Sequence, residues 1–157
     1  MADFNLLVQL LIQRNFFISA AESCTGGKFA AAIVDVPDAS KVLSASFITY
    51  SEEAKTALVG VPAKTISHFG VVSEEVARAM AKGAAAAARA DVGVGITGFA
   101  GPAGGTASCP VGTVCFGISI QGETRTYTRR FGGIGRNQVR DMAVSFAADQ
   151  LIGLLQT

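Results

Sequence analysis

Ser23 is the first residue in the chain whose position could support nucleophilic chemistry. The apolar, β-rich segment 16–21 runs into the sequence ESCTGG, and the segment 28–36 then has the composition of a helix that stops at a proline. A serine on such a strand-to-helix turn lies beside free backbone N–H groups, those of Cys24 and Thr25 among them, which can stabilise an oxyanion. Two alternatives remain: Ser23 only caps the helix, or the thiol of Cys24 is the nucleophile.

A tyrosine and a lysine in the segment YSEEAK form the second candidate. Tyr50 ends a predicted strand, Val42–Tyr50, and Lys55 lies one turn into the helix that we expect to begin after Ser51. A lysine acts as a general base only when it is neutral, and desolvation against apolar walls lowers its pKa from about 10.4 toward neutrality. We expect both side chains in a cleft at the same sheet edge as Ser23. The alternative is a solvated surface lysine beside a half-buried tyrosine.

A glycine-rich loop at 98–110 follows the predicted strand Val92–Thr97. In an open α/β sheet, ligands bind beyond the carboxyl ends of the strands, and the backbone N–H groups of such a loop can hold a phosphate. The loop matches neither the dinucleotide-binding pattern GxGxxG nor the P-loop pattern GxxxxGK[ST]. The alternative is a surface turn without a ligand. The loop carries the glycines Gly98, Gly101, Gly104 and Gly105, together with Thr106.

Two arginines, Arg136 and Arg140, lie four residues apart at the start of the predicted C-terminal helix. This spacing puts them on one face of the helix, where two guanidinium groups form a clamp for a phosphate or a carboxylate. The alternative is a solvated helix face. His68 is the only histidine, and we expect it at the surface. One histidine and three widely spaced cysteines leave too few ligands for a metal site.

The hydrophobic pattern predicts strands that alternate with helices. Strands are expected at 16–21, 42–50, 92–97, 111–120 and 123–131, the last two as a hairpin around Gln121 and Gly122. Helices are expected at 5–14, at 28–36, after Ser51, after Pro62, at 73–90 and from 135 or 136 onward. No internal repeat or domain boundary is visible, so we predict a single α/β domain over residues 1–157 with a mixed sheet.

The composition narrows the class of protein. Half of the residues are hydrophobic, and 13 Lys and Arg against 12 Asp and Glu give a net charge of +1. Such a chain can bury a substantial core, and no overall field draws it to nucleic acid or to an anionic membrane. The N-terminus lacks the features of a signal peptide, and no apolar run is long enough to span a bilayer. We therefore expect a cytoplasmic protein whose partner is a small molecule.

Six segments together resemble the CinA C-terminal domain family: AESCTGG, FITYSEEAK, GVVSEEVARAMAKGA, ITGFAGPAGG, PVGTV and GRNQVR. The resemblance covers nearly the whole chain. It implies a three-layer α/β/α sandwich and, as in the nicotinamide-nucleotide amidohydrolases of this family, hydrolysis of nicotinamide mononucleotide to nicotinate mononucleotide and ammonia. It also implies a mechanism without metal or cofactor, with Ser23 as nucleophile, Lys55 as base and Tyr50 assisting. The substrate-binding residues that it implies are Thr25, Gly26, Gly27, Thr97, Gly98, Gly101, Gly104, Gly105, Arg136 and Arg140.

The chain departs from the family pattern at two positions. Many relatives have GPDGG where this chain has GPAGG, and GDR where it has IGR, so that carboxylates are absent at Ala103 and Gly135. These departures favour a second reading, a non-catalytic nucleotide-binding module that regulates a process linked to competence or DNA damage. The apolar composition also allows a subunit interface, and a homodimer is the oligomer that we expect.

Overall fold

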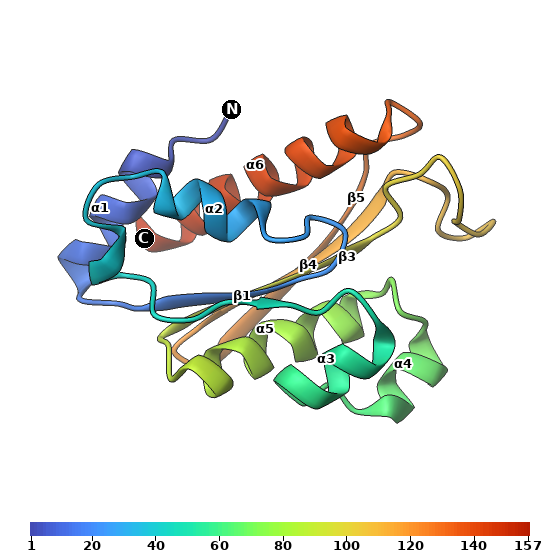
Figure 1. Ribbon diagram of the computed structural model, residues 1–157, viewed down its shortest axis with the longest axis horizontal. Coiled ribbons are helices and arrows are strands. Elements are labelled where there is room, and N and C mark those ends of the chain that lie inside the picture. Colours follow the sequence, from blue (N-terminus) through green and yellow to red (C-terminus); the bar gives the residue numbers. More distant parts are fainter.

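The structure, a computed structural model that describes residues 1–157, confirms the predicted three-layer α/β/α sandwich with a mixed sheet. Helices α1, α2 and α6 cover one face of the sheet, and α3, α4 and α5 cover the other (Figure 1). The helices are α1 (Phe4–Arg14), α2 (Lys28–Val34), α3 (Glu52–Val59), α4 (Ala63–Phe69), α5 (Glu74–Ala88) and α6 (Arg136–Leu155), with a short 3-10 turn at Ala39–Lys41.

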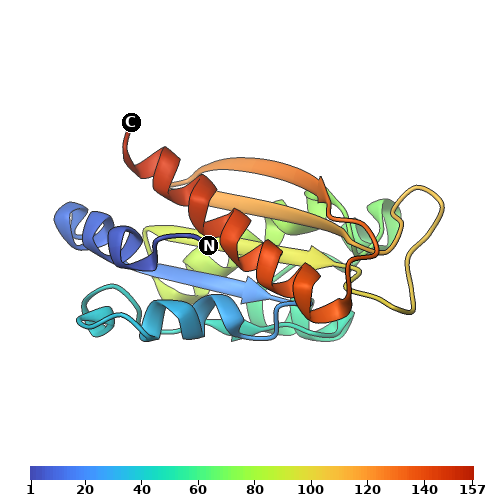
Figure 2. The same cartoon turned by 90° about the horizontal axis from the view of Figure 1, so that it is seen from above.

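The sheet has five strands in the order β2-β1-β3-β4-β5. Strand β1 is parallel to both β2 and β3, whereas β4 is antiparallel to β3 and β5 is antiparallel to β4. The three parallel strands therefore end at one edge of the sheet, and the first turn of α6 lies beside the tip of β1 at that edge (Figure 2). The strands are β1 (Ile18–Glu22), β2 (Phe47–Ile48), β3 (Val92–Gly98), β4 (Thr113–Ile120) and β5 (Glu123–Arg130).

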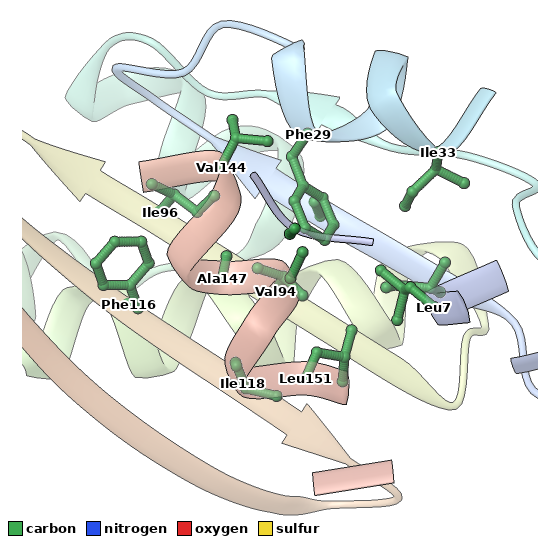
Figure 3. Close-up of a cluster of buried hydrophobic side chains, with 14 of the residues drawn as sticks. Leu7, Phe29, Ile33, Val94, Ile96, Phe116, Ile118, Val144, Ala147 and Leu151 are labelled. Atoms are coloured by element: carbon green, nitrogen blue, oxygen red, sulfur yellow. The ribbon is translucent and has the colours of Figure 1, made fainter. Parts of the chain in front are cut away.

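The larger part of the hydrophobic core fills the space between the sheet and the layer of α1, α2 and α6. The helices of this layer bury one face against the sheet, whereas the central strands β1, β3 and β4 lie between two helix layers and are buried on both faces. Figure 3 shows how these side chains interdigitate; its labelled residues are Leu7, Phe29, Ile33, Val94, Ile96, Phe116, Ile118, Val144, Ala147 and Leu151.

The predicted strand Val42–Tyr50 is wrong in its extent. Only Phe47–Ile48 forms a strand, and Leu43 makes an isolated bridge to the start of β1. Between Leu43 and Phe47, a side chain makes the hydrogen bonds that the backbone of a strand would make with β1. The Ser46 hydroxyl accepts from the Ala20 N–H and donates to the Ala20 carbonyl, both at 3.0 Å. The alternation of apolar residues in the sequence does not show that a side chain takes over these hydrogen bonds. The other predicted elements are present, with bounds that shift at their ends.

Helix α5 lies close to the sheet because glycines face it. A Cβ atom on Gly93, Gly95 or Gly117 would overlap backbone atoms of α5; on Gly95 it would lie 2.8 Å from the Ala81 nitrogen. Gly83 of α5 likewise allows α3 to pack closely against α5, since a Cβ atom on Gly83 would overlap the last carbonyl of α3. These contacts fix the depth at which α5, and with it α3, sits beneath the sheet.

The close approach of α5 can be tested at Gly95. We expect Gly95→Ala to lower the free energy of unfolding by about 2–3 kcal/mol, because the added methyl group must push α5 away from β3. The control is Gly153→Ala in α6, where a Cβ meets nothing within 4 Å and where alanine should add about 0.5–1 kcal/mol. Urea denaturation of both variants measures the difference, and equal midpoints for Gly95→Ala and the unsubstituted protein would contradict the packing argument.

Candidate active site

Ser23 directly follows β1, and its turn is tied both to the sheet and to α2. The Ser23 N–H donates to the Ile96 carbonyl of β3 at 3.0 Å. The buried carboxylate of Glu22, the last residue of β1, accepts the N–H groups of Phe29 (2.9 Å) and Ala30 (3.0 Å) in the first turn of α2. The N-cap of α2 is a glycine without a side chain, so Glu22 satisfies amides that the helix leaves free. The candidate nucleophile therefore stands on a fixed turn.

Lys55 reaches Ser23 from α3. This helix begins as predicted, with the Ser51 hydroxyl accepting the Ala54 N–H at 3.0 Å, and it places Lys55 in its first turn. The Lys55 side chain is fully buried, with 0% exposure. Its Nζ lies 3.0 Å from Ser23 Oγ and 2.7 Å from the carbonyl oxygen of Thr49. The alternative of a solvated surface lysine is therefore wrong, and the structure brings the two polar groups into direct contact.

The surroundings of Lys55 favour its neutral form. Burial lowers the pKa of Lys55 below its ordinary value, and the smaller influences of Cys24 and of the Glu52 carboxylate raise it. Lys55 forms no ion pair, because both salt bridges of the protein lie elsewhere on the surface. A neutral amine in contact with a hydroxyl is the arrangement that a general base requires.

Cys24, the alternative nucleophile, is buried beside Ser23. Burial raises the pKa of the Cys24 thiol to about 11, although Arg140 and Lys55 lower it by smaller amounts. A thiol with this pKa remains protonated near neutral pH, and the protonated form is a poor nucleophile. The surroundings of the two side chains therefore favour Ser23 over Cys24.

The turn also offers backbone donors next to Ser23. The N–H groups of Cys24 and Thr25 donate to no acceptor in another residue, whereas the following Gly26 N–H is bonded to the Ser23 carbonyl at 3.1 Å. Of the two, Cys24 lines the cavity and Thr25 is fully buried outside its lining. Free backbone amides beside a nucleophile can stabilise the negative charge that develops on an attacked carbonyl oxygen.

Ser23 and Lys55 lie in the wall of a cavity of about 550 Å³ at the carboxyl edge of the sheet. This volume lies within the range of about 300–1,000 Å³ that is typical of small-molecule sites. At the exposed rim, Arg136 donates to the Gly101 carbonyl (2.7 Å) and to the Tyr50 hydroxyl (3.0 Å). One guanidinium group thus joins α6, the glycine-rich loop and the segment after β2.

The structure divides the residues that the sequence predicted for the site. Those that line the cavity are Ser23, Tyr50, Lys55, Thr97, Gly98, Gly101 and Arg136. Those that lie outside its lining are Thr25, Gly26, Gly27, Gly104, Gly105 and Arg140. The predicted arginine clamp is therefore split, since only Arg136 faces the cavity.

An apolar wall of the cavity was not anticipated. Val71 and Val72, between α4 and α5, line it together with Phe99. The Thr97 hydroxyl, at the end of β3, donates to the Val71 carbonyl at 2.9 Å and so holds this wall against the sheet. Apolar residues next to a helix start look like core residues in a sequence, and nothing in their spacing marks them as part of a site.

The structure contains no group of three or more His, Cys, Asp and Glu side chains that could hold a metal ion. His68 is exposed on α4, as predicted, and does not line the cavity. None of the helices combines the length and the apolar character needed to cross a membrane.

The fold and this geometry define an α/β protein with a buried serine–lysine pair at the carboxyl edge of its sheet. The chain belongs to the CinA C-terminal domain family, which it matches over residues 4–155. It is 47% identical over 144 residues to a CinA-like protein of Kosmotoga olearia, covering 92% of this chain and 35% of that protein. It is 41% identical over 146 residues to a putative competence-damage inducible protein of Alkaliphilus oremlandii, covering 93% of this chain and 35% of that protein. The chain thus spans about a third of the length of these curated relatives.

Solved structures of CinA proteins have the same fold over the same length. The competence/damage inducible protein CihA from Agrobacterium tumefaciens superposes with a TM-score of 0.91 at 36% identity, covering 100% of this chain and 98% of that one. A competence-damaged protein (CinA) superfamily protein from Escherichia coli superposes with a TM-score of 0.92 at 40% identity, covering 96% and 87%.

The buried amine makes a prediction about stability and pH. The folded state holds Lys55 with a lowered pKa, so between that pKa and the unfolded value of about 10.4 the unfolded chain binds more protons. The free energy of unfolding should therefore rise with pH in this window, by at most about 1.4 kcal/mol per pH unit. Lys55→Met should lack this rise and should be relatively more stable at the low end of the window.

Urea denaturation of the unsubstituted protein and of Lys55→Met at several pH values measures the difference. Lys64→Met, at an exposed position of α4, is the matched control and should show no such change. A stability difference between the unsubstituted protein and Lys55→Met that is constant from pH 7 to pH 10 would contradict a lowered pKa of Lys55.

Proposed function

We propose that this domain hydrolyses the carboxamide of nicotinamide mononucleotide to give nicotinate mononucleotide and ammonia. The observation that carries the proposal is the 3.0 Å separation between Ser23 Oγ and Nζ of the fully buried Lys55. A neutral amine at this distance can take the serine proton, which makes the hydroxyl a nucleophile. The resemblance of the residues around both groups to the nicotinamide-nucleotide amidohydrolases supplies the substrate.

In the first chemical step, the Lys55 amine takes the Ser23 proton while Oγ attacks the carboxamide carbon. A tetrahedral intermediate forms, and its oxyanion accepts a hydrogen bond from the free N–H group of Cys24, which lines the cavity. The second contact of Lys55, to the Thr49 carbonyl, keeps Nζ in place throughout the transfer. The cationic pyridinium ring of the substrate withdraws electrons and makes the amide carbon easier to attack.

In the second step, the amide C–N bond breaks and ammonia leaves with a proton. The Lys55 ammonium supplies this proton, directly or relayed through the Tyr50 hydroxyl at the cavity rim, and becomes neutral again. The acyl group remains on Ser23 Oγ until water attacks it, with the Lys55 amine again acting as base. The products are the carboxylate and the regenerated serine.

The cavity lining suits the three parts of the proposed substrate. The apolar wall of Val71, Val72 and Phe99 suits an aromatic ring, and the serine–lysine pair lies where its carboxamide would react. Arg136 and the amides of residues 100–101, which donate to no acceptor in the protein, suit the phosphate.

A domain that binds a nucleotide without hydrolysing it is the second candidate, and Ala103 is the observation that favours it. Ala103 lines the cavity at a position where many relatives have an aspartate, and Gly135, the other departure, is the N-cap residue of α6. Calorimetric titration with nicotinamide mononucleotide alongside an ammonia assay separates the two. Binding without ammonia release would favour the regulatory module.

The central prediction concerns the two adjacent candidates for nucleophile. Ser23→Ala should reduce ammonia release from nicotinamide mononucleotide by at least about 10³-fold, since no other group can form the acyl intermediate. Cys24→Ala should retain most of the activity, because its thiol stays protonated. A coupled glutamate dehydrogenase assay measures the ammonia, and circular dichroism checks that both variants fold. Activity lost in Cys24→Ala and kept in Ser23→Ala would reverse the assignment.

A second prediction concerns the base. Because the pKa of Lys55 lies below its ordinary value, kcat should rise with pH and level off below about pH 10.4, as the amine loses its proton. Lys55→Arg keeps a long cationic side chain that stays protonated at every accessible pH, so it should be inactive throughout. A pH–rate profile of both proteins measures this, and a flat profile for the unsubstituted enzyme would argue against Lys55 as the base.

A further inference from the structure

Arg140 reaches from α6 to the underside of the turn that carries Ser23. Its Nε donates to the Cys24 carbonyl at 2.8 Å and one terminal nitrogen donates to the Thr25 carbonyl at 3.3 Å. The other terminal nitrogen donates to Asn137 Oδ1 at 3.0 Å. The first turn of α6 lies beside the tip of β1, so a side chain one turn into the helix can span the gap (Figure 2).

These contacts determine where the free amides of the turn point. A trans peptide is planar, and its C=O and N–H point in opposite directions. The carbonyl of Cys24 belongs to the same peptide as the Thr25 N–H, so a guanidinium that holds the carbonyl directs this N–H to the opposite side. The Ser23 carbonyl is held in the same way by the Gly26 N–H at 3.1 Å, which fixes the direction of the Cys24 N–H.

We propose that Arg140 is a positioning residue that holds the turn of Ser23 with its oxyanion donor, the Cys24 N–H, and that it does not clamp the substrate phosphate; this rests on the proposed function. The guanidinium is bonded to the carbonyls of the two peptides that follow the Ser23–Cys24 peptide, so it fixes the turn in which the Cys24 N–H keeps its direction.

Three further observations agree with this role. Arg140 does not line the cavity, whereas Arg136 on the same helix does. Each of the three Arg140 nitrogens is already bonded to an acceptor of the protein. The guanidinium also packs against Gly26 of the turn, whose φ is +54°: a Cβ atom there would lie in van der Waals contact with the Arg140 terminal nitrogen, at 3.4 Å.

The test compares two substrates that differ only in the phosphate, nicotinamide mononucleotide and nicotinamide riboside. We expect Arg140→Gln and Arg140→Lys each to lower kcat by about 10²-fold, with little change in KM, because each loses the fork that holds two carbonyls. The loss should be the same for both substrates. A KM that rises only for the mononucleotide, with kcat unchanged, would show a phosphate clamp and overturn the proposal.

Asp141→Ala is the matched control. It removes the Asp141–Lys28 ion pair (3.0 Å) from the adjacent position of α6 without touching the turn, and its kcat should equal that of the unsubstituted protein. Chemical rescue adds a readout that a general loss of packing would not give. Methylguanidine should restore part of the kcat of Arg140→Ala, and should not affect Ser23→Ala; no restoration would count against the positioning role.

A measurement that does not depend on the natural substrate keeps the two proposals separate. p-Nitrophenyl acetate should acetylate Ser23 in the unsubstituted protein, with release of p-nitrophenolate, and peptide mass spectrometry locates the acetyl group. Arg140→Gln should acetylate Ser23 about 10-fold or more slowly. If the mononucleotide is not hydrolysed but this rate difference appears, the proposed function fails and the role of Arg140 stands. If Arg140→Gln is acetylated at the unsubstituted rate, the role of Arg140 fails whatever the substrate.

Discussion

The site depends on one costly arrangement, an amine that is fully buried without a carboxylate partner. Removing a lysine side chain from water destabilises its charged form. The only hydrogen-bond partners that replace water at Lys55 are a carbonyl oxygen and a hydroxyl. The fold must be stable enough to tolerate this desolvation. The same desolvation that costs stability lowers the pKa of Lys55, so the price of burial and the basicity needed for catalysis have a single cause.

The rest of the molecule serves to keep Lys55 and Ser23 together although they come from different layers. Parallel pairing of β1 with β2 and β3 brings the ends of three strands to one edge, where the residues that follow them meet. Glycines of the sheet let α5 approach closely, and α5 in turn supports α3, the helix that carries Lys55. A small displacement of α5 would therefore change the distance between Lys55 Nζ and Ser23 Oγ, because packed layers transmit strain.

The sequence predicted the parts of the site that obey local rules. The turn after β1, the serine cap of α3 and the glycine-rich loop each have a residue signature, so their elements were placed correctly. What escaped prediction depends on tertiary contacts. Strand β2 is short because the Ser46 side chain takes the hydrogen bonds of β1 that a longer strand would form. Val71 and Val72, which line the cavity, have the sequence character of core residues. Arg140 differs from Arg136 only in the direction of its side chain, which turns toward the Cys24 carbonyl and not toward the cavity. Spacing on a helix shows which residues share a face, but not which of them reaches a cavity.

Two buried ionisable residues adjoin Ser23: Glu22 precedes it in the chain, and the Lys55 amine contacts its hydroxyl. The proposed chemistry requires that the carboxylate and the amine do not pair. If the Glu22 carboxylate paired with the amine, it would favour the charged form of Lys55 and raise its pKa, which would remove the base. The structure avoids this pairing because both carboxylate oxygens accept amides from the first turn of α2, and such amides stabilise an anion without a cation. The hydrogen bonds of Lys55 go to the neutral Thr49 carbonyl and to the serine hydroxyl. The beginning of α2 therefore does two things at once: it fixes the turn that presents the nucleophile, and it keeps the nearby negative charge away from the amine.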